Sequence, residues 1–180
     1  MKILALETST EFCSVALDLG EQSFHQEELA ERRHSEILLP MVQALLSEAG
    51  LALQQIDAIA FGAGPGSFTG LRIACGVAQG LAYAIGLPVL AISTLEAIAQ
   101  QTGKQKVIVA LDARMNEIYH AAYYKHSDCQ WKIISEPTLC SPTHVPLLEG
   151  NDWIGCGSGF DLHSHKLSER YQEQLHTIVS

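Results

Sequence analysis

The most distinctive stretch of the chain is FGAGPGSFTGLR, residues 61–72, in which four glycines fall within nine residues. Glycines let a backbone approach a ligand closely, and the free N–H groups at a helix start favour negative charge, so this stretch could bind a phosphate. It is not a P-loop, because no Gly-Lys-Ser/Thr follows, and it lacks the G-x-G-x-x-G spacing. A tight strand-to-helix turn explains the glycines equally well. The candidate phosphate contacts are Gly64, Gly66, Ser67 and Thr69.

Two acidic residues, Glu7 and Asp112, directly follow short apolar runs and face polar turns. A carboxylate at such a strand end could hold a metal–nucleotide complex, although an acid in a turn is more often only solvated. No nucleophile with an adjacent histidine and no pair of carboxylates on one element is evident, so the residue types indicate no catalytic site. Of the eight histidines only His163 and His165 are close in sequence, and without a third ligand we predict no metal site.

Composition narrows the class of protein. The chain has 180 residues, of which 47% are hydrophobic, enough for one ordinary domain or two small lobes. Its formal charge of −9, from 11 Lys+Arg and 20 Asp+Glu, argues against direct binding of RNA or DNA. The N-terminus lacks signal-peptide features, and no run approaches the ~18 apolar residues of a membrane span. We therefore expect a cytoplasmic protein that does not associate with a membrane. The scattered cysteines are expected to be buried free thiols: Cys13, Cys75, Cys129, Cys140 and Cys156.

The elements that must position these residues repeat along the chain. An apolar run at 3–6, a polar turn TSTE and a second apolar run at 13–19 predict an antiparallel hairpin. The same pattern returns at 107–111, ARMNE and 118–124. The sequence therefore predicts two similar α/β units.

Helical and strand signals alternate between the two hairpins, which favours a mixed sheet covered by helices. We expect a first helix at 37–48, with Pro40 near its first turn or kinking it. A second helix should run from 69 to 84 or 85, capped by Ser67 or Thr69 and ended by Gly86. A third should be capped by Ser93 and Glu96 and end near Gly103. The expected strands are 56–61 and 88–93. Beyond residue 126 the pattern is less regular, and WIGCGSGF, residues 153–160, predicts a strand entering a second glycine turn.

The helix after the glycine loop carries small residues in two rows, one formed by Gly70, Ala74, Ala78, Ala82 and Gly86 and the other by Gly76, Gly80 and Ala84. Each internal glycine costs ~1 kcal/mol relative to alanine, so either the chain's own sheet or a partner helix should pack closely there. The expected partner interface combines both helices: Leu38, Met41, Val42, Leu45, Arg72, Ala74, Ala78 and Leu81.

Five stretches, in this order over about the first 125 positions, resemble the TsaB (YeaZ) family: LALETSTEFCSVAL, HSEILLPMV, FGAGPGSFTGLR, AISTLEAIAQ and LDARMNEIY. The resemblance implies the α/β fold of actin, sugar kinases and heat-shock ATPases (ASKHA), with two related lobes of mixed β-sheets and helices. We expect an N-terminal lobe at 1–103 and a C-terminal lobe at 104–180. TsaB-like chains usually continue for several tens of residues past the WIGCGSGF-like strand, so we expect either a shortened second lobe or a chain that is a fragment.

The resemblance also implies a function. TsaB-like proteins work with the related TsaD, and with a TsaE-like ATPase, in making N6-threonylcarbamoyladenosine next to the anticodon of tRNAs that read codons starting with A. This chain would then be a noncatalytic scaffold subunit, homodimeric when alone, that reaches tRNA only through the complex and has no cofactor of its own, although ATP or ADP could bind in the complex. The alternatives are a stand-alone ATPase or glycopeptidase-like enzyme of the same superfamily, or a homodimeric binding module.

TsaD carries a motif resembling V-N-H-L-E-G-H whose two histidines bind the catalytic metal. The matching stretch here is ISTLEAI, residues 92–98, which places Thr94 and Ile98 where those histidines would stand. A hydroxyl and an alkyl side chain cannot replace two imidazoles, so the resemblance implies no metal. It also favours turn geometry and helix packing as the role of the glycines.

Overall fold

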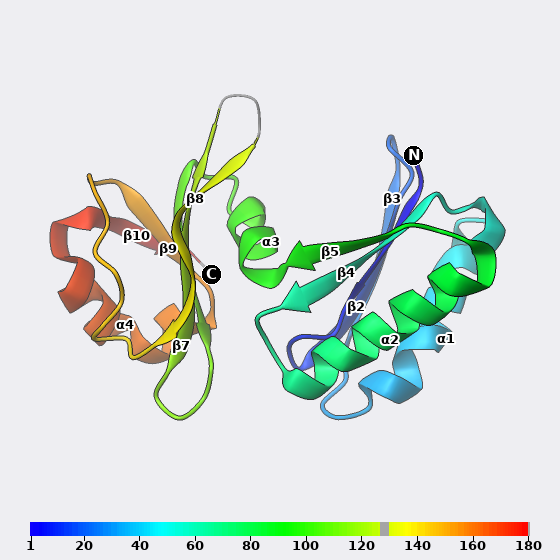
Figure 1. The fold of residues 1–180 in the computed structure, drawn as a ribbon, viewed down its shortest axis with the longest axis horizontal. Coiled ribbons are helices and arrows are strands. Elements are labelled where there is room, and N and C mark those ends of the chain that lie inside the picture. Colours follow the sequence, from blue (N-terminus) through cyan, green and yellow to red (C-terminus); the bar gives the residue numbers. More distant parts are fainter. Residues whose placement is uncertain (127–129, 180) are drawn as a thin grey trace. The chain divides into compact units, whose positions relative to one another are not determined.

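The computed structural model describes residues 1–126 and 130–179 and contains two five-stranded mixed sheets. The chain divides into two compact units, Met1–Thr94 and a C-terminal unit that begins at Leu95 (Figure 1). Each unit has its own apolar core.

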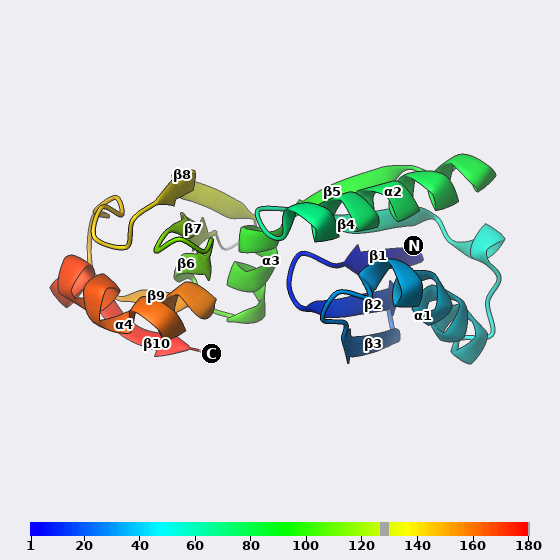
Figure 2. The ribbon, with the colours of Figure 1, turned by 90° about the horizontal axis from the view of Figure 1, so that it is seen from below.

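The N-terminal unit places two helices on one face of its sheet (Figures 1 and 2). Its sheet has the order β3-β2-β1-β4-β5, in which β1 to β3 are antiparallel neighbours and β4 and β5 run parallel to β1. The strands are β1 (Ile3–Glu7), β2 (Phe12–Asp18), β3 (Ser23–Leu29), β4 (Ala58–Gly64) and β5 (Val89–Ser93), and the helices are α1 (His34–Glu48), the short η1 (Leu53–Gln55) and α2 (Phe68–Ile85).

The core of this unit follows from the alternation of the strands. Leu4 and Leu6 of β1 and Val15 of β2 face the helices and are buried, as two-residue periodicity requires. The fully buried side chains of helix α2 in this core are small, namely Ala78 and Ala82, while Ile73, Val77 and Leu81 pack against the core and stay partly exposed.

The C-terminal unit repeats this topology. Its sheet has the order β8-β7-β6-β9-β10, with the same sequence of antiparallel and parallel pairings as the first sheet. Alternate residues of β6 face opposite sides, so Ile108 packs towards α4 and Val109 towards α3, one helix on each face (Figure 2). The elements are α3 (Thr94–Gln101), β6 (Lys106–Asp112), β7 (Ile118–Lys125), β8 (Trp131–Cys140), β9 (Trp153–Cys156), α4 (Ser158–Tyr171), η2 (Gln172–Gln174) and β10 (Leu175–Val179).

Two related lobes with mixed sheets and helices form the two-lobed ASKHA architecture that the sequence predicted. Three details differ. The units meet at Thr94/Leu95 rather than at 103/104, because Leu95 and Ala99 of α3 are buried in the core of the second sheet. Helix α1 begins at His34, so Pro40 lies in its second turn and not its first. The region after residue 126 is more regular than the sequence suggested, with three strands and a helix.

Helix α2 begins and ends as predicted, with Ser67 as N-cap and Gly86 in the left-handed conformation as C-cap. The sequence analysis expected no segment with the length and apolar character of a membrane span. Helix α2 does have that length and mean hydropathy. The central helix of a water-soluble domain can meet the same criterion, and α2 packs one row of small residues on its own sheet.

Candidate functional site

The glycine loop before α2 packs directly against the turn that joins β1 and β2. A Cβ on Gly66 would lie 2.6 Å from the Cβ of Ser9, and a Cβ on Gly70 would collide with the carbonyl oxygen of Thr8. The Ser67 N–H donates to the Ser9 carbonyl at 2.7 Å, and the Thr8 hydroxyl donates to the Gly70 carbonyl at 2.7 Å. The chain's own packing therefore requires glycine at positions 66 and 70.

This packing also occupies donors that an anion would use. The Gly70 N–H donates to the Ser67 hydroxyl at 3.3 Å, which satisfies one group of the first helical turn. Gly64 has a positive φ of 98°, which suits the sharp change of direction before the helix, and Thr69 is exposed in the first turn. The structure does bring the four predicted contacts together at the start of α2. Their geometry favours the turn interpretation, and phosphate binding stays a prediction.

Each candidate carboxylate holds its own hairpin turn. Glu7 Oε1 accepts the Ser9 N–H at 2.5 Å, and a Cβ on Gly62 would collide with this carboxylate. Asp112 Oδ1 accepts the Arg114 N–H at 3.0 Å, and its Oδ2 lies 3.4 Å from the Arg114 guanidinium. These intramolecular contacts give both carboxylates a role in their own turns that needs no ligand. Nucleotide binding by Glu7 or Asp112 stays a prediction.

The second glycine turn, at the start of α4, has the same packing role. Gly157 adopts a positive φ of 95°, and a Cβ on it would lie 2.5 Å from the carbonyl oxygen of Ala110. A Cβ on Gly159 would lie 2.9 Å from the Cβ of Ala110, while the Ser158 hydroxyl accepts the Asp112 N–H at 3.1 Å. Both units thus use a glycine turn to seat a helix start, on the β1–β2 turn in the first unit and on β6 in the second.

The two residues that the resemblance aligned with the TsaD histidines, Thr94 and Ile98, lie in α3, which begins at Thr94. Thr94 is buried, and Ile98 packs against the apolar core of the C-terminal unit. Over residues 1–126 and 130–179, no three His, Cys, Asp or Glu side chains are grouped as a metal site would need. The absence of a bound metal stays a prediction for experiment.

The thiols of Cys13 and Cys156 are buried, as predicted, and burial raises their pKa to about 11 and about 12. The thiols therefore stay protonated and unreactive at neutral pH. Cys75 and Cys140 are only half-buried, and Cys129 lies outside the described residues.

A buried polar pair escaped the sequence reasoning. His120 of β7 and Tyr171 of α4 are both inaccessible to solvent, and His120 Nε2 lies 2.6 Å from the Tyr171 hydroxyl. Burial lowers the pKa of His120 to about 4, so the imidazole is neutral at pH 7. The available signal was the inward position of His120 in the alternating strand IYHAAYYK.

Most of the residues predicted for the partner interface lie in the interior of the N-terminal unit. The side chains of α1 that were assigned to it form the buried face of that helix, because the apolar stripe covers the chain's own sheet. The first row of small residues on α2 likewise faces the sheet. The six interface residues that lie in the interior are Leu38, Met41, Val42, Leu45, Ala74 and Ala78, whereas Arg72 is exposed and Leu81 is half-buried.

The exposed side of α2 has a different character. No described atom beyond the helix's own backbone and immediate neighbours lies within 4 Å of a Cβ placed on Gly76 or Gly80, so the fold of the chain requires neither glycine. On the same exposed side, the Arg72 guanidinium lies 3.7 Å from the centre of the Phe68 ring, and the Tyr83 side chain is 93% exposed.

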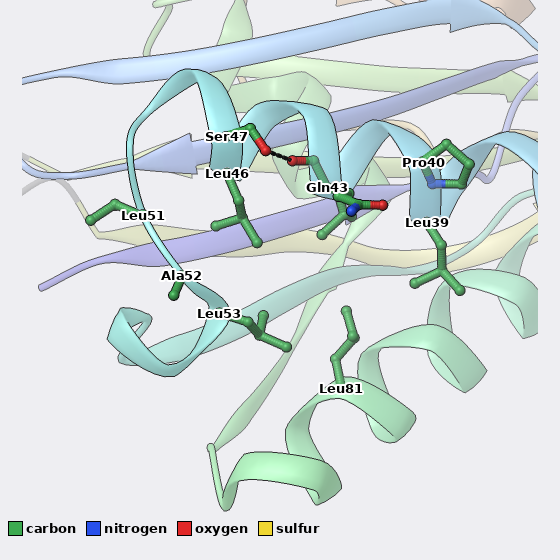
Figure 3. Close-up of a pocket in the computed structure, with 10 residues that line it drawn as sticks. Leu39, Pro40, Gln43, Leu46, Ser47, Leu51, Ala52, Leu53 and Leu81 are labelled. Atoms are coloured by element: carbon green, nitrogen blue, oxygen red, sulfur yellow. Dashed lines mark hydrogen bonds between the residues drawn. The ribbon is translucent and has the colours of Figure 1, made fainter.

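An apolar pocket of about 440 Å³ adjoins these helices (Figure 3). It lies between α1, the segment that follows it and Leu81 of α2, with Gln43 and Ser47 as its polar side chains. Its lining residues are Leu39, Pro40, Val42, Gln43, Leu46, Ser47, Leu51, Ala52, Leu53 and Leu81.

Comparisons with known proteins place the chain in a family. The family model described as "TsaD: tRNA N6-adenosine threonylcarbamoyltransferase" matches residues 19–153. The "tRNA threonylcarbamoyladenosine biosynthesis protein TsaB" of Haemophilus influenzae is 43% identical, over 91% of this chain and 75% of that protein. The chain belongs to the TsaB (YeaZ) family. The Escherichia coli K12 TsaB is 41% identical, over 89% of this chain and 72% of its own length. The structure of YeaZ from Pseudomonas aeruginosa superposes with a TM-score of 0.88 and 40% identity, over 99% of this chain and 84% of that one.

For this TsaB-family chain, the motif GPGSFTGLR thus combines two features. Gly66 and Gly70 seat the helix on the β1–β2 turn. Phe68 and Arg72 lie in contact on the exposed side of α2.

Proposed function

We propose that the chain is the noncatalytic partner subunit of a TsaD-containing complex that makes N6-threonylcarbamoyladenosine next to the anticodon of tRNAs reading codons that start with A. Membership of the TsaB family supports this proposal, because two of its relatives are named for the biosynthesis of that nucleoside. The complex acts in the cytoplasm, and a TsaE-like ATPase joins it.

The observation that carries the proposal is the pair of exposed glycines on α2. Glycine inside a helix costs about 1 kcal/mol relative to alanine, and nothing in the described chain approaches Gly76 or Gly80 closely enough to require it. A partner helix that lies against this side does require it, because small residues let two helix backbones come close. Exposed Tyr83 would then become buried at the same contact.

The partner we infer is a TsaD-like protein with the same fold. Its equivalent helix would pair with α2 about a pseudo-two-fold axis, and a second copy of this chain would take its place when the partner is absent. The pocket beside Leu81 would accept an apolar side chain from the partner. Because the chain carries a net charge of −9, the basic surface that binds tRNA belongs to the partner. ATP or ADP bound in the complex would be held mainly by the other subunits.

The double variant Gly76→Gln, Gly80→Gln tests this interface. Glutamine is a good helix former and meets open space at both positions, so the chain should fold with an unchanged or higher thermal midpoint. Affinity for the TsaD-family protein of the same organism, measured by calorimetry, should fall at least about tenfold. The matched control is Ser164→Gln on the exposed side of α4, which should bind like the unmodified chain.

Two results would count against the proposal. Unchanged affinity of the folded double variant would place the partner elsewhere. Threonylcarbamoyl transfer by the purified chain alone would show that the subunit is catalytic.

A further inference from the structure

We draw no further inference here: the strongest candidate, the apolar face of the N-terminal sheet opposite α1 and α2, on which Phe12 of β2, Leu29 of β3 and Leu90 and Ile92 of β5 are exposed, carries none because nothing in the structure shows what covers it.

Discussion

His120 should make the stability of the C-terminal unit depend on pH between about 6.5 and 4. The imidazole is buried between β7 and α4, where Nε2 contacts the Tyr171 hydroxyl at 2.6 Å. Its Nδ1 has no hydrogen-bond partner within residues 1–126 and 130–179, so nothing in the described chain would stabilise the added proton. Protonation must therefore place an uncompensated charge in an apolar core.

The direction and size of this pH effect on stability follow from the pKa of His120. Burial lowers the pKa of His120 from its ordinary value of 6.5 to about 4, so the unfolded chain binds the proton more tightly than the folded one. Stability is fully present above pH 6.5 and is lost as the pH falls towards 4. At 1.36 kcal/mol per pKa unit, the loss amounts to about 2 kcal/mol at pH 5 and about 3 kcal/mol once the folded state is also protonated.

Tryptophan fluorescence can follow this unit selectively, because the chain's two tryptophans, Trp131 and Trp153, both lie in it. Urea unfolding at pH 7.5 and pH 5.0 should show a smaller free energy of unfolding at the lower pH. His120→Gln does not titrate and serves as the matched variant, so other groups that titrate cancel in the comparison. The unmodified chain should lose about 2 kcal/mol more than His120→Gln between the two pH values. An equal loss in both proteins would refute the role assigned to His120.

Three further predictions concern packing and metal. Gly70→Ala should destabilise the N-terminal unit by about 3 kcal/mol, because the new Cβ meets the Thr8 carbonyl. Gly80→Ala should stabilise this unit by about 1 kcal/mol, because its Cβ meets open space. Urea unfolding followed by far-UV circular dichroism measures both changes in the free energy of unfolding. Ala78→Arg should unfold this unit, since an unpaired buried charge costs several kcal/mol; a folded, monodisperse variant in circular dichroism and size-exclusion chromatography would contradict the buried position. Elemental analysis of tag-free protein should find no stoichiometric iron or zinc, and one tightly held metal per chain would contradict this.

Features that depend on neighbours in sequence were predictable. Both hairpins were found from two apolar runs separated by a polar turn, and Ser67 and Gly86 marked the ends of α2. The return of the first hairpin's pattern at 107–124 anticipated the shared topology of the two sheets. The boundary between the units was misplaced because α3 is a short connection, and only its packing through Leu95 and Ala99 assigns it to the second core.

The sequence by itself determined where strands, turns and helices lie, because backbone conformation is set mainly by nearby residues and by apolar periodicity. Only the tertiary structure decided which side of α2 faces its own sheet. Two rows of small residues look alike in sequence, yet Ala78 is buried whereas Gly76 and Gly80 face open space. The same holds for Gly70, whose need for glycine comes from the carbonyl of Thr8, 62 residues away along the chain. Contacts between distant segments depend on how elements pack in space, and no local pattern encodes them.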